Sequence, residues 1–450
     1  METKRGTLVL TDISGYTRFT RMHFTSLLHA EEIISELLEA VIHATEFPLQ
    51  VGQLEGDAVL LFAEADEGQQ VQAAHEALAQ MDRLFAAFYA RERALIGCDA
   101  GCVCDACTQI GQLRLKAVLH FGTFRPEEIG GVRSLGGEDV KLLRTLVKTA
   151  VPEQEYLLLT EDFYALSGKL DGRDPDRIIP DDGRGESRIY FPHITAPAAV
   201  PLPAGAGPAF SGRINKHAFA RMFGRVARAP FANLERGPMN LLIYLLEGTQ
   251  SGLNLIVRAF HKKFARPDIV ISNAALVLAE VSAGAQGQDE TISQVLKAVV
   301  AAAPPELLLN KLEGDAAFFF TRSRGDAALI ARDTARRVSA LHCAFQTEQA
   351  VRGASAEGLH LKILLHFGQV AFKRIGAFEE LAGSDVILIH RLLKSDLPGQ
   401  VGALMTERFY RLSGGLDGID AQVRTDYAEG LGNAPVRVCA LDGDYVAINS

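Results

Sequence analysis

The chain contains three short motifs twice, in the same order. LEGDA occurs at 54–58 and at 312–316, LHFG at 119–122 and 365–368, and LSG[K/G]LDG at 166–172 and 412–418. The first pair is separated by 258 positions and the other two pairs by 246. A register that holds over such a length indicates an internal duplication. We therefore expect two related domains, which can pack on each other as an internal pseudo-dimer.

The composition limits the classes of partner. The chain has 450 residues, with 46 basic and 55 acidic side chains and a net charge of −9. This balance argues against nucleic-acid or anionic-membrane binding, which normally needs a basic face. The first residues lack the long apolar run of a signal peptide, and the most apolar stretch, Met239–Leu246, is too short to span a bilayer. We expect a cytoplasmic protein without a transmembrane segment.

The pattern of apolar residues predicts the same kind of fold in both domains. We expect an N-domain at 1–195, a linker and connecting insert at 196–267, and a C-domain at 268–450. In the N-domain, strand-like runs such as GTLVLT and LRLKAVLHFG alternate with helical periodicity at 29–44, 69–90 and 139–148. This order predicts an α+β fold with a mainly antiparallel sheet, of the ferredoxin-like kind.

Four cysteines lie within ten residues of the N-domain, Cys98, Cys102, Cys104 and Cys107. They occupy the twelve residues by which the N-domain exceeds the C-domain. Four thiolates can hold a structural zinc, although the single residue between Cys102 and Cys104 is a tighter spacing than zinc sites usually have. The alternative is a loop of reduced thiols without metal.

Two aspartates stand where strands end. Asp12 follows the strand-like run LVLT and precedes Ser14, Gly15 and Tyr16, where a bend leads into a helix, and Asp57 lies in the Gly-Asp turn of a predicted hairpin. Two carboxylates on adjacent strand ends suit magnesium, and backbone N–H groups at such a bend can hold phosphate oxygens. The alternative for either aspartate alone is ordinary turn or helix-capping chemistry.

Together these segments resemble a known family. LVLTDISGYTRF, followed by LEGDAVLLF about 45 residues later, is similar to the catalytic domain of class III adenylate and guanylate cyclases. The HRLLK run at 390–394 is similar to a less characterised bacterial branch. The resemblance implies a dimer-type active site, in which one face holds two Mg²⁺ or Mn²⁺ ions and the other reads the purine and supplies an arginine.

Transferred to this sequence, the resemblance divides the site between the domains. It implies metal ligands at Asp12, Asp57 and the backbone of Ile13, with Ser14, Gly15 and Tyr16 at the substrate. In the C-domain it implies purine recognition by Lys311 and Glu380, and transition-state stabilisation by Arg391. The two composite sites then differ. At the positions of Lys311, Glu380 and Arg391, the N-domain has Gln53, Ser134 and Thr145, respectively. The C-domain has Asn273 aligned with Asp12, and it keeps an aspartate, Asp315, at the position of Asp57.

The resemblance therefore implies one complete composite site and one dead site. The expected activity is cyclisation of ATP, less readily GTP, to a 3′,5′-cyclic nucleotide and pyrophosphate. Two departures favour an alternative: Ile387 replaces the family's asparagine, and the family's triphosphate-binding lysine falls at Glu429 or Leu431. That alternative is an inactive cyclase-fold sensor of a nucleotide or small molecule that acts through a regulatory partner or further self-association. A structural scaffold is the third interpretation.

Overall fold

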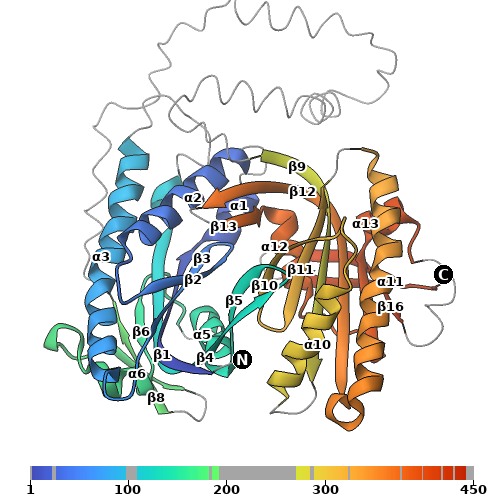
Figure 1. The fold of residues 1–450 in the computed structure, drawn as a ribbon. Helices are drawn as coiled ribbons and strands as arrows, with labels where there is room; N and C mark the ends of the chain where they lie inside the picture. Colours follow the sequence, from blue (N-terminus) through green and yellow to red (C-terminus); the bar gives the residue numbers. More distant parts are fainter. Residues whose placement is uncertain are drawn as a thin grey trace, which may run out of the picture. The chain divides into compact units, whose positions relative to one another are not determined.

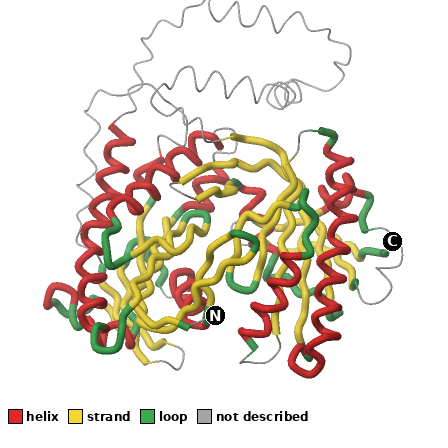
Figure 2. The backbone as a smooth tube through the Cα atoms, in the orientation of Figure 1, coloured by secondary structure: helices red, strands yellow, loops and turns green. Residues whose placement is uncertain are grey.

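The computed structural model describes residues 3–22, 27–97, 109–149, 151–181, 185–191, 270–283, 288–322, 325–375, 378–397, 399–416, 419–428 and 431–441. The linker and insert predicted at 196–267 and the four-cysteine cluster lie outside these residues. Within the described part, the predicted α+β fold is confirmed: the chain forms two similar mixed sheets, each covered by helices (Figures 1 and 2).

The N-domain begins with a long central strand and continues through the elements expected from its apolar periodicity. Its strands are β1 (Lys4–Ser14), β2 (Gln50–Glu55), β3 (Ala58–Glu64), β4 (Arg114–Ile129), β5 (Val132–Gly136), β6 (Leu157–Leu159), β7 (Arg177–Asp181) and β8 (Gly185–Tyr190). Its α-helices are α1 (Tyr16–Met22), α2 (Leu27–Ala44), α3 (Gln70–Gly97), α5 (Glu138–Thr149) and α6 (Glu161–Ser167), with single 3-10 turns η2 (Ile110–Gln112) and η3 (Leu170–Gly172).

The C-domain repeats this plan. Its strands are β9 (Val270–Ala283), β10 (Leu308–Glu313), β11 (Ala316–Arg322), β12 (Leu359–Ile375), β13 (Phe378–Ala382), β14 (Val401–Thr406), β15 (Gln422–Ala428) and β16 (Gly432–Ala440). Its helices are α10 (Asp289–Ala301), α11 (Ala327–Arg352), α12 (Ser384–Leu392) and α13 (Glu407–Ser413), with a 3-10 turn, η4 (Gly353–Ala356).

The two sheets have the same strand order. It is β2-β3-β1-β4-β6-β8-β7 in the N-domain and β10-β11-β9-β12-β14-β16-β15 in the C-domain, and β5 and β13 pair with the ends of β4 and β12. The neighbours are antiparallel except for the pairs β4–β6 and β12–β14. Because the strand registers correspond as well, each residue of one sheet has a defined counterpart in the other.

Alternation along the central strands separates two apolar layers in each domain. In β9, Leu276 and Leu278 pack with α12 on one face, whereas Val277 and Val281 pack with α10 and α11 on the other. This is the period-two burial of a strand with both faces covered. The predicted helix at 69–90 continues to Gly97, because the turns after Ala90 still bury Leu95.

Each domain contacts the other through the end of one of its long strands, β4 or β12. Ile129, at the end of β4, belongs to the apolar core of the C-domain. The adjacent Gly130 has a φ of +59°, and a β-carbon there would lie 2.9 Å from Leu309 Cδ2, so this turn needs glycine. In the other direction, Lys373 near the end of β12 reaches Glu31 on α2. These reciprocal contacts are those of a pseudo-dimer folded from one chain.

Candidate functional site

The register of the central strands places the two N-domain aspartates together. Asp12 lies opposite Ala58 on β3 and Lys116 on β4, and Asp57 occupies the turn between β2 and β3. The Ile13 backbone N–H donates to the Asp57 carbonyl oxygen at 3.0 Å. This bond closes the hairpin tip onto the end of β1, as the sequence predicts.

The acid pair is electrostatically unfavourable without a cation. Burial raises the pKa of Asp12, although Lys116, whose Nζ lies 3.2 Å from Asp12 Oδ1, opposes that rise. The pKa of Asp57 is raised well above its usual value, first by burial and then by the neighbouring Asp12 carboxylate. Lys116 and, more weakly, Lys148 offset part of this negative charge, and a bound cation would stabilise the ionised form of both carboxylates.

The donor set fits Mg²⁺ or Mn²⁺ held with a phosphate ligand. In the part of the chain that the structure describes, no group of three or more His, Cys, Asp or Glu side chains is arranged to hold a metal. Asp12 and Asp57 would therefore supply one or two carboxylates, and backbone, water and phosphate oxygens would complete the shell, which is the usual magnesium pattern. These residues would neutralise phosphate charge through the cation.

The bend after Asp12 offers donors beside the acid pair. Gly15 has a φ of +92°, and its carbonyl oxygen accepts from the Phe19 N–H at 2.8 Å, which starts α1. The Ser14 hydroxyl is buried and has no hydrogen-bond partner among the described residues. A buried hydroxyl without a partner is costly unless a ligand or water satisfies it, so Ser14 could donate to a phosphate oxygen.

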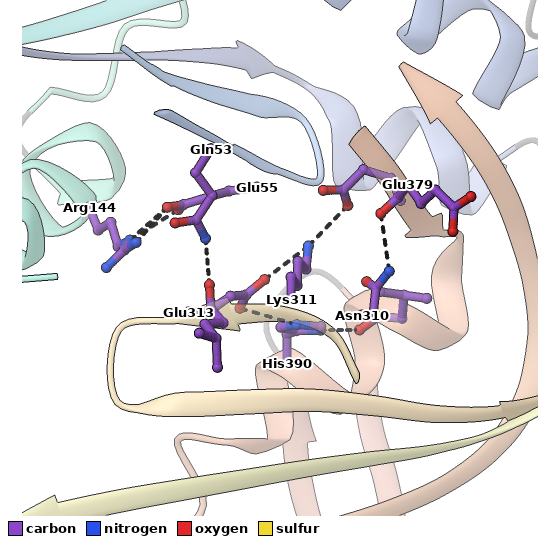
Figure 3. Close-up of polar contacts among 11 residues, drawn as sticks. Gln53, Glu55, Arg144, Asn310, Lys311, Glu313, Glu379 and His390 are labelled. Carbon is purple, nitrogen blue, oxygen red and sulfur yellow. Dashed lines mark hydrogen bonds and ion pairs between the residues drawn. The ribbon is translucent and has the colours of Figure 1, made fainter. Parts of the chain in front are cut away.

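The C-domain contributes a buried group of alternating charges (Figure 3). Lys311 Nζ donates to Glu380 Oε2 at 3.2 Å and lies 3.0 Å from Glu313 Oε1, and His390 Nε2 lies 3.1 Å from Glu313 Oε2. Lys311 is 5% exposed and Glu380 is 4% exposed. The structure thus brings together Lys311 and Glu380, which the sequence places 69 residues apart.

The carboxylates of this group fix the charge on Lys311. Burial alone would lower the pKa of Lys311, but Glu380 and Glu313 outweigh it and raise that pKa. Burial likewise opposes ionisation of Glu313, yet His390 and Lys311 hold its pKa well below the usual range. For Glu380 burial is stronger than the attraction of Lys311 and Lys373, so its pKa is raised. A charged lysine beside a carboxyl group can donate to and accept from a purine edge.

Arg391 follows His390 in the last turn of α12 and is half-buried. Ile387 lies one turn earlier on the same helix. Helix α12 packs against β12, the strand that also pairs with β13 and so with Glu380. Arg391 therefore belongs to the same side of the C-domain as the Lys311 group, and its role at the reacting phosphate stays a prediction.

Buried polar contacts between the domains link the acid pair, Asp12 and Asp57, to the C-domain group around Lys311 and Glu380. The Tyr16 hydroxyl donates to Glu31 Oε1 at 3.2 Å, and Lys373 Nζ donates to Glu31 Oε2 at 2.9 Å. The side chains of Glu31 and Lys373 are both 0% exposed. Lys373 is the register partner of Glu380. Glu31 therefore connects the bend after Asp12 to β12, where Lys373 lies opposite Glu380 of β13.

Glu31 and Lys373 were not identified from the sequence, although a signal was present. Glu31 shares the helical face of Ile34, Leu38 and Val41 on α2, and all three are buried. A charged residue on such a face has to find a buried partner. The signal is incomplete, because nothing in the sequence says that the partner comes from the other domain.

One alignment made from the sequence is wrong. The register pairs Asn273 with Gln369, whereas Glu280 lies opposite Ala316 and Lys362, the counterparts of Ala58 and Lys116. Glu280, not Asn273, is therefore the equivalent of Asp12. Only residues 284–288 separate β9 from α10, so the C-domain has no room for the helix α1, and the deletion is ten residues rather than three. The C-domain thus keeps an acid pair, Glu280 and Asp315.

The repeated histidines are part of the scaffold. His120 Nδ1 lies 2.9 Å from Thr160 Oγ1 and its Nε2 lies 3.4 Å from Asp139 Oδ1. His366 makes the same two contacts, with Thr406 at 2.8 Å and Asp385 at 3.1 Å. Because both domains preserve this arrangement, it supports the fold and not a function of one domain.

Comparison with known proteins identifies the family. A family model described as a protein of unknown function (DUF2652) matches residues 34–156 and 292–401, just over half of the chain. The chain belongs to this family. The two matched segments start at equivalent residues, Ile34 and Ile292, so the DUF2652 match includes corresponding parts of both domains.

An uncharacterized protein of Mycobacterium tuberculosis is 34% identical over 126 residues, covering 26% of this chain. The chain spans 57% of the length of that relative. The sequence of this relative is similar to part of this DUF2652 chain, and its description names no activity.

Solved structures give the fold. A class III adenylyl cyclase-like ATP-binding protein from Pseudomonas aeruginosa aligns over 91% of this chain and 85% of its own, with a TM-score of 0.50 and 11% identity. The adenylyl cyclase CyaB from P. aeruginosa aligns over 38% of this chain and 95% of its own, with a TM-score of 0.33 and 14% identity. The first likeness shows that this DUF2652 protein has a cyclase-like fold in both domains. No helix among the described residues is long and apolar enough to cross a membrane.

Proposed function

We propose that the chain binds a purine nucleoside triphosphate, ATP in preference to GTP, with Mg²⁺ or Mn²⁺ at one composite site. The observation that carries this proposal is the acid pair of the N-domain, in which Lys116 pairs with Asp12. Asp57 has a strongly raised pKa, and the contacts of Tyr16 and Glu31 connect that region to the C-domain group around Lys311 and Glu380. Metal-bound phosphates would lie at the first group and the base at the second.

The division of charge supports this orientation. Asp12 and Asp57 are two neighbouring carboxylates of which one is paired with Lys116, which favours a cation and the phosphates that it carries. Lys311 and Glu380 offer a donor and an acceptor side by side, with Glu313 also 3.0 Å from Lys311, which suits an uncharged base better than a phosphate. The cyclase-like P. aeruginosa neighbour is an ATP-binding protein, and this agrees with the proposal.

The reaction that this set of residues would support is cyclisation of the nucleotide. The ribose 3′-hydroxyl would attack the α-phosphorus, the bond to the β-phosphate oxygen would break, and pyrophosphate would leave. Mg²⁺ or Mn²⁺, when bound, supplies charge neutralisation for the triphosphate. Arg391 would add fixed positive charge as negative charge develops on the phosphate, which is worth on the order of 10³-fold in related phosphoryl transfers.

A second function, nucleotide binding without turnover, is favoured by two observations. Ile387 leaves α12 without a polar group one turn before Arg391, so the ribose would lack a contact from that helix. Lys116 is already paired with Asp12 at 3.2 Å, so one of the two carboxylates is less available to a metal. In this case the chain would act as a nucleotide sensor.

Calorimetric titration with Mn²⁺ and ATP, followed by mass spectrometry of the products, tests both functions. The wild type should bind one ATP per chain, and Asp57→Asn should lower the affinity at least tenfold. Asp315→Asn, the equivalent change in the C-domain, is the matched control and should leave that affinity unchanged.

The products separate the two functions. Cyclic nucleotide that is formed by the wild type and lost in Arg391→Ala would establish cyclisation. Binding without cyclic nucleotide would establish the sensor. The absence of ATP binding by folded wild-type protein would contradict the proposal.

A further inference from the structure

A lysine of the N-domain enters the acid pair of the C-domain. Lys141, on α5, places its Nζ 3.0 Å from Asp315 Oδ2 and 3.0 Å from Asp289 Oδ1. Glu138 Oε1, one turn earlier on α5, lies 3.5 Å from Lys141 Nζ. Burial alone would lower the pKa of Lys141, but Asp315 and Asp289 outweigh it and raise that pKa. The ammonium group is therefore held between carboxylates of the other domain.

This contact has no charged counterpart on the other side of the pseudo-dimer. In the corresponding registers, Asp315 is equivalent to Asp57, Asp289 to Glu31 and Lys141 to Ile387. Ile387 carries no charge, so from this position α12 cannot form an ion pair with Asp57 like the one that Lys141 on α5 forms with Asp315. The two acid pairs thus differ in what faces them, although both have kept their acids.

Arg144 strengthens the difference. Its Nε donates to Glu55 Oε1 at 2.9 Å, and the carboxylates of Glu313 and Asp315 also attract its guanidinium group. A β-carbon built on Gly314, the residue before Asp315, would lie 3.3 Å from Arg144 Nη1. The turn that carries Asp315 therefore has two cations of α5 against it, whereas the counterparts of those cations on α12 are Ile387 and His390.

The other acid of the C-domain is neutralised within its own sheet. Glu280 Oε2 lies 3.5 Å from Lys362 Nζ, as Asp12 lies beside Lys116. Each acid of this pair therefore has a lysine ammonium group within 3.5 Å, Lys362 at Glu280 and Lys141 at Asp315. In the N-domain pair, Lys116 lies 3.2 Å from Asp12, and Lys148 contributes a weaker attraction to both acids.

We propose that Lys141 closes the second composite site: its ammonium group lies against Asp315 where a phosphate-bound cation would otherwise have to bind, so that each chain holds a single nucleotide. This inference rests on the proposed nucleotide site for its consequence. The ion pair itself can be tested without nucleotide.

Two reciprocal substitutions test the consequence by calorimetric titration with Mn²⁺ and ATP. Ile387→Lys places an ammonium group opposite Asp57, and it should lower ATP affinity at the open site at least tenfold. Lys141→Ile gives the second site the isoleucine that the open site has opposite Asp57. It should let Mn²⁺-ATP bind a second time and raise the stoichiometry from one to two, with lower affinity than at the open site because Gln53 and Ser134 stand in place of Lys311 and Glu380. Thermal unfolding of each variant checks that it is folded.

Amine acylation followed by mass spectrometry tests the ion pair directly. The Lys141 amine should be acylated several-fold faster in Asp315→Asn than in the wild type, because the carboxylate holds the unreactive ammonium form. Lys169, whose partner is Asp174 on the surface, is the control and should react equally fast in both proteins.

The outcomes separate this inference from the proposed function. Wild-type protein that binds no ATP would overturn the proposed function, and the acylation rates would still decide whether Lys141 is held by Asp315. Wild-type protein that binds one ATP, with Lys141→Ile also binding one, would overturn closure by Lys141. Equal acylation of Lys141 in wild type and Asp315→Asn would overturn the ion pair itself.

Discussion

At the residue scale, the same acidic side chain has opposite energetic effects in the two domains. Asp57 is half-buried beside Asp12, and its pKa is raised, so its ionised form destabilises the fold. Asp315 instead lies 3.0 Å from Lys141, so its charge is compensated. A structural turn alone would not explain keeping the unfavourable aspartate, whereas a ligand site would, because binding sites commonly sacrifice stability.

The pH dependence of the stability follows from this difference. A carboxyl group whose folded pKa lies above its unfolded value has no effect below the unfolded pKa and costs stability as the pH rises through the folded pKa. Asp57→Asn should therefore be more stable than the wild type at pH 8, by about 1 kcal/mol, and the difference should disappear near pH 4. Urea unfolding at the two pH values measures it.

Asp315→Asn is the matched control for this pH series. It removes a half-exposed ion pair and should lower the free energy of unfolding at pH 8 by about 0.5–1 kcal/mol. The same sign of change for both variants would contradict the assignment of an uncompensated charge to Asp57.

At the element scale, the repeated LHFG motif is explained by the helix that follows it. A β-carbon on Gly368 would lie 2.3 Å from Asp385 Oδ2, and one on Gly122 would lie 2.3 Å from Asp139 Oδ2. Asp385 accepts from the Gln369 N–H at 2.6 Å and contacts His366. The glycine thus lets the start of α12 approach β12, and α12 carries His390 and Arg391.

Gly368→Ala should destabilise the protein by about 1–3 kcal/mol, because the new methyl group displaces Asp385 from a packed position. Gly325→Ala is the control, since nothing lies within 4 Å of a β-carbon there, and it should change the free energy of unfolding little. Urea unfolding compares the two variants. An unchanged stability of Gly368→Ala would show that the approach of α12 is not tight.

The helix α1 is the element that makes the two sites different in shape. It occupies the connection between β1 and α2, and Tyr16 at its start binds Glu31. The C-domain connection of residues 284–288 is too short for it. The helix α1, with Tyr16 at its start, therefore distinguishes the N-domain acid pair from that of the C-domain, which favours the assignment of the N-domain pair to phosphate binding.

At the scale of the whole molecule, the contacts between the domains should make them unfold together. Ile129 packs in the core of the C-domain, and Lys373 forms a fully buried ion pair with Glu31 of the N-domain. Loss of either domain would expose apolar surface of the other. Hydrogen exchange should therefore give the central strands β1 and β9 the same free energy of opening.

Lys373→Met tests this coupling. It leaves Glu31 charged and buried, and it should lower the stability of both β1 and β9 by about 3–5 kcal/mol. Arg374→Met, the neighbouring change, removes an exposed pair with Glu379 and should have little effect. Loss of protection in β1 with unchanged protection in β9 would contradict cooperative unfolding.

The duplication, the α+β class, the order of most elements and the residue types at the candidate site can all be predicted from the amino-acid sequence. They can be predicted because apolar periodicity and repeated motifs are local properties of the chain. Lys311 with Glu380 and Asp12 with Asp57 were found by resemblance. Strand register and the turn between β2 and β3 bring Asp12 and Asp57 together, whereas Lys311 of β10 and Glu380 of β13 meet through their side chains.

The residues that face each other across the two domains are known only from the folded chain. Asn273 was misaligned because the length of a deletion cannot be read from one sequence, whereas hydrogen-bonded register identifies Glu280 directly. Lys141, Glu31 and Lys373 have ordinary sequence surroundings. Their importance comes from partners between 148 and 342 positions away, and electrostatic energy depends on distance in space and burial, which the order of residues along the chain does not contain.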